Sequence, residues 1–314
     1  MTSQSCPLVT IGIPTYNRAS SYLKEALQSA LNQSYPNIEV IVSDNCSTDH
    51  TEVLAKGCAQ PFLRYFKHPK NIRANDNFNF CLQQARGHYF LLLHDDDIID
   101  RDFVEACINA TGGDLSTGII RTGTRLIDGN GNVCGETPNR AQGLTTAEFF
   151  AAWLTGRTAM YLCSTLFNTA RLREIGGFKS KTDLFQDVLA EIQLAANFGR
   201  IDVQDVKASF RRHNDNNGSK ARVNDWCEDS LFLLDTICDL APELEYTLRQ
   251  QGIGYFCRKN YGIASRIKSP IERVSAYMMI FRRFGYRYSP IHYMYHRLER
   301  KTRRAFALLL QHSL

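Results

Sequence analysis

Residues 8–93 alternate between short apolar, β-branched runs and amphipathic segments, and this alternation constrains the fold more than any other feature of the chain. Strands are expected at 8–13, 38–42, 63–66 and 88–93, with helices at about 23–31, 51–59 and 75–86 between them. The alternation predicts an α/β protein with a mostly parallel central sheet and helices on both of its faces.

Polar clusters follow three of these strands at the point where each strand ends. The clusters are residues 15–18, 44–45 and 94–97. Because parallel strands have their carboxyl ends at one edge, and ligands of α/β sheets bind beyond that edge, we expect the clusters to form one binding site.

Beyond residue 93 the pattern loosens, and from about residue 224 it is mainly helical. The expected elements are a hairpin around 128–132, a helix at 145–155 that opens with a capping box, a strand at 162–167 and a helix that begins at Asp187. Two domains are therefore expected, over residues 1–222 and 223–314.

The composition, 44% apolar and 22% charged over 314 residues, is typical of globular proteins and excludes disordered and fibrous classes. The ten cysteines form no Cys-x-x-Cys pair, so neither a zinc site nor a disulfide scaffold is expected. The N-terminus has no signal-peptide pattern, and no apolar run approaches the roughly 20 residues of a membrane span. These features predict a reduced, cytoplasmic protein.

Positive charge is concentrated near the C-terminus. Residues 251–314 hold 13 Lys and Arg but only 2 Asp and Glu, a net charge of +11. Within 291–310, apolar residues recur at helical spacing: Ile291, Met294, Tyr295, Leu298, Ala305, Phe306 and Leu309. A basic amphipathic helix can lie on an anionic membrane surface, here the inner face of the plasma membrane; the alternative is a helix packed on the rest of the protein. No recognition motif accompanies the charge, so nucleic acid is not an expected partner.

Three consecutive carboxylates, Asp95 to Asp97, emerge from an apolar strand. Like charges this close raise each other's pKa and cost stability unless a cation neutralises them. Mg²⁺ and Mn²⁺ bind through one or two carboxylates together with substrate phosphates. The triplet therefore predicts a divalent metal site, with a solvated acidic turn as the alternative.

The N-terminal two thirds of the chain resemble the family 2 glycosyltransferases. The matching segments are VTIGIPTYNR at 9–18, EVIVSDNCSTDHT at 39–51, ARGHYFLLLHDDDII at 85–99, GGF at 176–178, QD at 186–187 and FRRHNDNNGS at 210–219. The resemblance covers roughly residues 8–220. It implies a GT-A fold, which is a Rossmann-like, mixed but mostly parallel sheet, and a nucleotide-sugar-binding catalytic domain over 1–222.

The resemblance also implies which side chains bind the donor. The nucleotide pocket would be lined by Pro14, Thr15, Tyr16 and Arg18. Asp44 would bind the base and Asp95 the ribose. The residues near the phosphates would be Asn71, Arg73, Arg211 and Arg212. Several of these residues have ordinary structural alternatives. Tyr16 could be a core aromatic, Asp44 a loop or N-cap residue, and the two adjacent arginines a solvated turn.

The metal, Mn²⁺ or Mg²⁺, would be held by Asp96 and Asp97 with His213. The family's Asp-x-Asp-Asp pattern would begin at residue 94, where this chain has His94. Asp96 is then the natural metal ligand, although a register that begins at Asp95 would select Asp97. His94 is either a pocket residue or an ordinary strand-end histidine.

Inversion at the anomeric carbon needs a base that removes the proton of the acceptor hydroxyl. Asp187 occupies the position that the family resemblance assigns to this base, with Asp183 as the second choice. The family commonly has Glu before this Asp, whereas here Gln186 precedes it, which removes a repelling charge. The structural alternative for Asp187 is a helix N-cap.

The resemblance thus implies a metal-dependent, inverting, hexosyltransferase-like enzyme of polysaccharide biosynthesis. The expected partners are a UDP-sugar donor and a glycan or lipid-linked acceptor. A sugar nucleotidyltransferase is one alternative, which the lack of a Gly-rich basic loop after the first strand disfavours. A non-catalytic nucleotide-sugar-binding protein at a membrane surface is the other.

Overall fold

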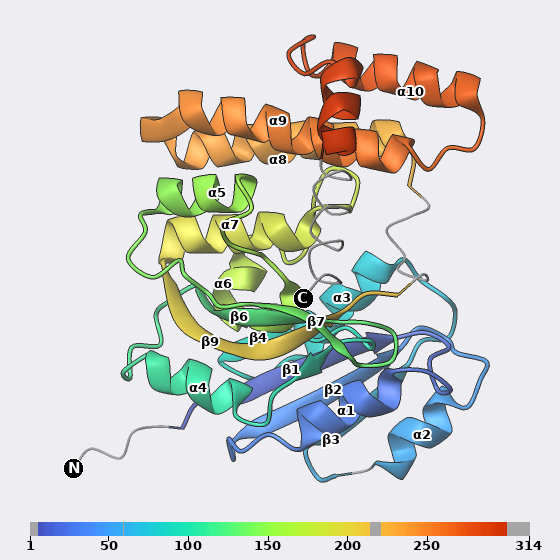
Figure 1. Ribbon diagram of the computed structural model, residues 1–314. Coiled ribbons are helices and arrows are strands. Elements are labelled where there is room, and N and C mark those ends of the chain that lie inside the picture. Colours follow the sequence, from blue (N-terminus) through green and yellow to red (C-terminus); the bar gives the residue numbers. More distant parts are fainter. Residues whose placement is uncertain (1–5, 59, 214–220, 300–314) are drawn as a thin grey trace, which may run out of the picture. The chain divides into compact units, whose positions relative to one another are not determined.

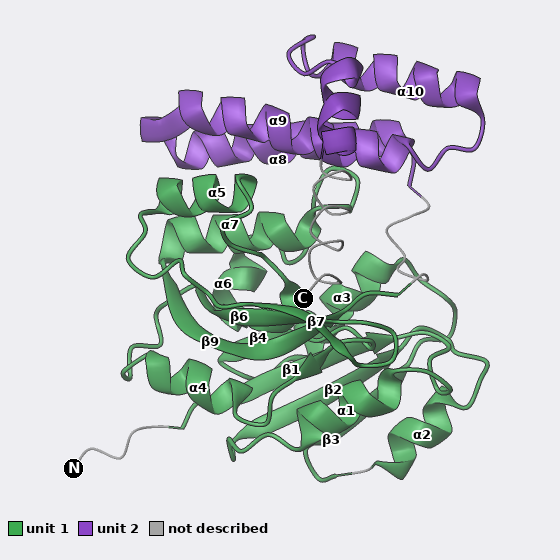
Figure 2. Cartoon of the chain, in the orientation of Figure 1, with its two compact units in different colours: residues 1–216 green, residues 217–314 purple. Residues whose placement is uncertain are grey.

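The computed structural model describes residues 6–58, 60–213 and 221–299. The chain divides into two compact units, residues 1–216 and 217–314 (Figure 2). The boundary expected from the sequence, between 222 and 223, lies six residues further along the chain.

One mixed sheet forms the centre of the first unit (Figure 1). Its described strands are β1 (Val9–Thr15), β2 (Ile38–Asp44), β3 (Leu63–Lys67), β4 (Tyr89–Leu92), β5 (Ile98–Ile99), β6 (Ile119–Ile127), β7 (Val133–Thr137), β8 (Thr165–Asn168) and β9 (Arg200–Arg211). The order is β3-β2-β1-β4-β8-β6-β9-β5, and β7 pairs with β6. The first four strands are parallel, as expected, whereas β8 runs antiparallel to both of its neighbours.

Helices cover this sheet on both faces. Those described in the first unit are α1 (Leu23–Leu31), α2 (Thr51–Gly57), α3 (Ala74–Gln84), α4 (Phe103–Ala110), α5 (Thr146–Leu154), η1 (Leu162–Ser164), α6 (Thr169–Glu174) and α7 (Gln186–Phe198). The capping box expected before α5 is present, between Thr145 and Glu148.

The strand β1 shows how the two faces are packed, because alternate residues of a strand point to opposite sides. Ile11 belongs to the same buried cluster as Leu27 of α1 and Phe103 of α4. Gly12 faces α3 instead, and a Cβ added there would lie 2.9 Å from the Cβ of Cys81. Only glycine therefore allows α3 to approach the sheet this closely.

Two strands differ from the expectation. The predicted strand at 162–167 begins instead as the 3₁₀ turn η1, and pairing starts at Thr165. The long strand β9 was not predicted. Its register against β6 jumps from Arg121↔Asp202 to Gly123↔Val206, so a bulge interrupts the apolar–polar alternation by which strands are found in a sequence. The hairpin expected around 128–132 is present between β6 and β7.

The second unit is helical in its described part. Its elements are α8 (Val223–Leu240), η3 (Pro242–Leu244), α9 (Glu245–Ala264), α10 (Pro270–Arg283) and a helical stretch over 290–299. Three tyrosines from three of these helices pack together, since the ring of Tyr261 lies 5.2 Å from those of both Tyr277 and Tyr293. The predicted tail positions Ala305, Phe306 and Leu309 lie outside the described residues. None of the described helices combines the length and apolarity that a bilayer crossing requires.

Candidate active site

The loops after β1 and β2 are joined by hydrogen bonds at the carboxyl edge of the sheet. The Asn17 N–H donates to the Ser47 hydroxyl (2.8 Å), and the Asn17 side chain accepts from the Thr48 N–H (2.9 Å). Asn17 and Cys46 both have positive φ, of 53° and 64°. This conformation is uncommon outside glycine, and here it turns both loops toward each other.

The residues expected in the nucleotide pocket differ in exposure. Pro14 and Thr15 are buried at the end of β1, whereas Tyr16 is 47% exposed, so the alternative that Tyr16 is a core aromatic is wrong. Asp44 is fully buried at the end of β2. Its carboxylate accepts from the Ser47 N–H (2.8 Å) and from the Tyr65 hydroxyl (2.5 Å), so it fixes the loop that follows.

Two of the phosphate candidates lie before α3. Asn71 is exposed, and its amide donates to the Asn45 carbonyl. Arg73 forms ion pairs with Asp76 (2.8 Å) and with Asp183 (3.2 Å). Asp183, the second choice for the base, therefore lies in an ion pair with an exposed guanidinium.

The acidic triplet forms the loop between β4 and β5. Burial and the neighbouring charge of Asp96 raise the pKa of Asp95 to about 6, against the opposing effects of Thr15 and Arg18. Burial and Asp96 likewise raise the pKa of Asp97, which is 1% exposed. Three carboxylates thus share one site, with the Nε of Arg18 3.8 Å from Asp95, and a divalent cation would offset their repulsion.

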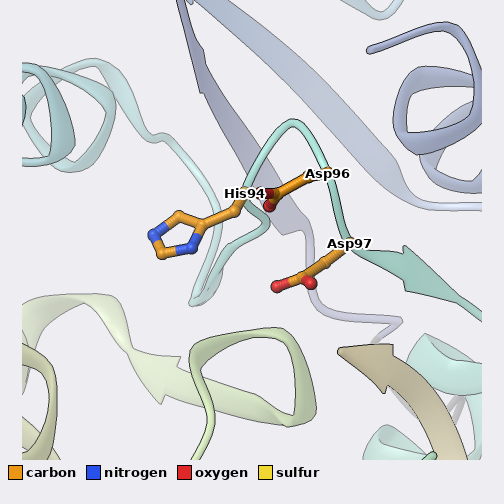
Figure 3. Close-up of side chains that lie close together, drawn as sticks. All are labelled: His94, Asp96 and Asp97. Atoms are coloured by element: carbon orange, nitrogen blue, oxygen red, sulfur yellow. The ribbon is translucent and has the colours of Figure 1, made fainter. Parts of the chain in front are cut away.

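His94, Asp96 and Asp97 form a cluster that could hold such a cation. Each offers one ligand atom, and these atoms lie within 4.8 Å of one another. In Figure 3 both carboxylates project from the loop toward the side on which the His94 ring lies. The combination of two carboxylates and an imidazole fits a divalent first-row ion, so the residues present are compatible with the metal that the resemblance implies.

The end of β9 closes the site from the other side. The Nε2 of His213 is hydrogen-bonded to Asp96 (2.7 Å), which brings together two of the predicted metal-site residues. Arg211 is 1% exposed, and its backbone N–H donates to Asp97 (2.9 Å). Arg212, the other phosphate candidate here, has an exposed side chain.

The guanidinium of Arg211 is occupied by protein acceptors. It donates to the Asp96 carbonyl (2.8 Å), to the Asp128 carbonyl (3.4 Å) and to Glu25 of α1 (2.7 Å). The alternative of a solvated turn is therefore wrong for Arg211, and its donors hold the acidic loop against the hairpin and α1.

Asp187 lies in the first turn of α7. The helix begins at Gln186 and its N-cap is Phe185, so the alternative that Asp187 is an N-cap is wrong. Asp187 is half-buried, and the preceding Gln186 has a buried Oε1 that finds no hydrogen-bond partner among the described residues.

One buried carboxylate near Asp187 was missed from the sequence. Glu191 follows Asp187 by one helical turn, is 1% exposed, and lies 3.3 Å from the guanidinium of Arg121 on β6. Burial and the charge of Asp187 raise the pKa of Glu191, while Arg121 opposes the shift. A Glu between the apolar positions Leu189 and Ile192 of a helix is the signal that could have revealed it.

The short segment 163–165 connects the acidic loop with α7. The Cys163 thiol lies beside Asp97, and the Thr165 hydroxyl contacts Glu191. Cys163 therefore contacts the acidic loop, and Thr165, two residues later, contacts α7, the helix that carries Asp187.

The fold and this edge of the sheet define a GT-A fold, as solved structures confirm. The chain superposes on Staphylococcus aureus TarS 1–349 in complex with UDP with a TM-score of 0.66 and 18% identity, covering 88% of this chain and 79% of that one. It superposes on the mannosyltransferase PcManGT from Pyrobaculum calidifontis, in complex with GDP-Man and Mn²⁺, with a TM-score of 0.57 and 17% identity, over 87% and 74% of the two chains.

Residues 10–122 match the model of glycosyl transferase family 2, so this segment belongs to that family and the resemblance is confirmed. A chondroitin synthase from Escherichia coli is 37% identical over 134 residues, which are 42% of this chain and 19% of that protein. An uncharacterized protein, y4gI, from Sinorhizobium fredii is 29% identical over 192 residues, 59% and 20% of the two chains. The chain thus spans about a fifth of each of these relatives.

Proposed function

We propose that this chain is an inverting glycosyltransferase that moves a hexosyl group from a nucleotide diphosphate donor to a hydroxyl of a glycan or lipid-linked acceptor. The observation that carries the proposal is the cluster of His94, Asp96 and Asp97 at the carboxyl edge of the sheet. Ligands of α/β sheets bind at this edge, and a divalent cation there would bind the donor diphosphate.

The donor would lie across the loops after β1 and β2. The exposed ring of Tyr16 offers a flat surface to a base. Asp44 would accept the imide N–H of a pyrimidine, which requires the loop after β2 to uncover this buried carboxylate. Arg18, whose Nε lies 3.8 Å from Asp95, would share the ribose side of the pocket with that carboxylate. A UDP-sugar is the donor that this arrangement favours.

Asp187 would act as the base. It takes the proton of the acceptor hydroxyl while the acceptor oxygen bonds to the anomeric carbon, and the bond from that carbon to the diphosphate breaks on the opposite face. Mn²⁺ or Mg²⁺, when bound, would supply positive charge to stabilise the departing diphosphate. Asp96, Asp97 and His213 would hold the ion, and Arg211 would keep the acidic loop in place.

A thermal-shift panel of nucleotide sugars with and without Mn²⁺ tests the donor. A ligand at 100 times its Kd stabilises the native state by about 2.7 kcal/mol. For a chain of this size that corresponds to a rise in Tm of about 4 °C. We expect a UDP-sugar with Mn²⁺ to give this rise, and a panel without any metal-dependent shift would contradict the proposal.

We further propose that the second unit contacts an anionic membrane at the cytoplasmic face. Its described helices carry two exposed apolar stripes: Ile271, Val274 and Met278 on α10, and Ile291, Met294, Tyr295 and Leu298 on the stretch 290–299. The α10 stripe lies on the helix side away from the buried Ile280, and the stripe on 290–299 lies away from Tyr293, which packs in the tyrosine cluster.

The charge of this region supports an anionic membrane as the partner of these stripes. Residues 266–299 contain seven Lys and Arg but only two Asp and Glu. Apolar side chains flanked by excess positive charge fit the interface of a bilayer with anionic headgroups, where each Lys or Arg contributes on the order of 1 kcal/mol.

Vesicle cosedimentation tests this surface. Replacing Ile271, Val274 and Met278 together by Ser should lower binding to anionic vesicles by at least about tenfold, because each apolar side chain contributes on the order of 1 kcal/mol when buried. Val53→Ser is the matched control, since Val53 is 69% exposed but lies on α2. Binding should weaken with salt. Equal binding to neutral and anionic vesicles would contradict the proposal. So would a truncation of residues 291–314 that lowers the Tm while the full chain shows no preference for anionic lipid.

A further inference from the structure

The inference concerns His94 and rests on the proposed function. His94 follows the end of β4, at the position where the Asp-x-Asp-Asp pattern of family 2 glycosyltransferases has its first Asp. The chain therefore replaces an oxygen donor by a nitrogen donor at the start of the acidic loop.

The position of the His94 ring is fixed by its neighbours. The ring packs against Phe78 of α3, with a centroid distance of 5.2 Å and an interplanar angle of 36°. In this position one ring nitrogen comes within 4.8 Å of a carboxylate oxygen of both Asp96 and Asp97. The α3 contact thus keeps the imidazole beside the carboxylates instead of in solvent.

The hydrogen bonding of the cluster is incomplete on the His94 side. The Nε2 of His94 is buried and has no hydrogen-bond partner within the described part of the chain. Asp96 and Asp97, in contrast, already accept from His213 and from the Arg211 N–H. Figure 3 shows the Nε2 of His94 on the side of the ring away from the carboxylates, so Nδ1 is the ring nitrogen that could bind an ion together with Asp96 and Asp97.

We propose that His94 is a direct ligand of the metal and that the site consequently prefers Mn²⁺ or Co²⁺ to Mg²⁺. Mg²⁺ requires hard oxygen ligands, whereas imidazole binds first-row transition ions more strongly in the order Mn²⁺ < Co²⁺. An all-carboxylate loop would accept either kind of ion. The substitution of nitrogen for oxygen at residue 94 selects between them.

Electron spin-echo spectroscopy of Mn²⁺ bound together with UDP tests the ligation directly, because a coordinated imidazole nitrogen modulates the echo. His94 and His213 both lie within reach, so wild type, His94→Asn and His213→Asn are compared. The nitrogen modulation assigned to His94 should disappear in His94→Asn. His88→Asn is the matched control, because His88 lies exposed at the opposite end of the same strand and bonds the Leu115 carbonyl.

His94→Asp tests the metal preference. Loss of an outer-shell partner alone costs about 10–100-fold in metal affinity, so the ratio of Mn²⁺ to Mg²⁺ affinity should fall by at least about tenfold in this variant. Equilibrium dialysis of each ion with UDP gives the ratio, and the thermal unfolding curve verifies that the variant is folded.

The outcomes separate this inference from the function on which it rests. Mn²⁺ binding with a nitrogen modulation unchanged by His94→Asn would overturn the role of His94 and leave the metal site intact. Absence of Mn²⁺ binding to the wild type, with or without UDP, would overturn the metal site itself. Unfolded variants would make His94 a packing residue against Phe78, which also contradicts the inference.

Discussion

Asp187→Asn should lower the rate of sugar transfer by about 10²–10⁴-fold while leaving the Kd for the donor close to the wild-type value. The substitution keeps the shape of the side chain in the first turn of α7 but removes its ability to accept a proton. Steady-state transfer assays give the rate, and calorimetry with a UDP-sugar gives the Kd. The fold should change little, because loss of a charge near a helix N-terminus costs about 0.3–1 kcal/mol.

Asp183→Asn is the matched control for this prediction. Asp183 is a nearby carboxylate, but it is paired with Arg73 and accepts from the Asn75 amide (3.1 Å). Its replacement should affect turnover much less. If Asp183→Asn abolished transfer and Asp187→Asn did not, the base would be Asp183.

Asp96→Ala should remove most of the metal-dependent part of donor affinity, a loss of at least about 10–100-fold. Asp96 combines a carboxylate with a hydrogen bond from His213, so its loss removes a ligand and frees the imidazole that orients it. Donor titrations in Mn²⁺ and in EDTA measure the effect. In EDTA, wild type and variant should bind the donor equally weakly.

Two further variants make the metal prediction specific. Asp97→Asn distinguishes the two registers of the acidic loop, because the larger loss identifies the carboxylate that contributes more to metal binding. Asp114→Ala removes an exposed carboxylate outside the site and should have no effect. Equal donor affinity of the wild type in Mn²⁺ and EDTA would contradict any metal role.

The hydrogen-bonded loops after β1 and β2 explain why a substitution of Asp187 should change the transfer rate without changing donor affinity. The residues proposed to contact the nucleoside lie on the loops after β1 and β2, which Asn17, Ser47 and Asp44 fix at the sheet edge. Asp187 belongs to α7, a different element, on which the donor loops do not depend for these hydrogen bonds. A base substitution should therefore leave the donor pocket intact.

Much of the front of the molecule could be predicted because its signals are local. The strands β1, β2 and β4 are mainly apolar and buried, and their ends are marked by the polar clusters that form the candidate site. The hairpin turn and the capping box before α5 also depend on residues close in sequence. Local patterns suffice where the interacting residues are neighbours along the chain.

The sequence by itself determined the parallel start of the sheet, the edge at which the candidate site lies and the family to which residues 10–122 belong. Only the tertiary structure decided that β9 enters the sheet beside β6, that Arg211 is taken up by Asp96, Asp128 and Glu25, and that Glu191 pairs with Arg121. These contacts join residues that are distant in the chain, up to 186 positions for Arg211 and Glu25. No local periodicity records them, because a buried charge is satisfied by whichever partner the packed sheet brings within reach.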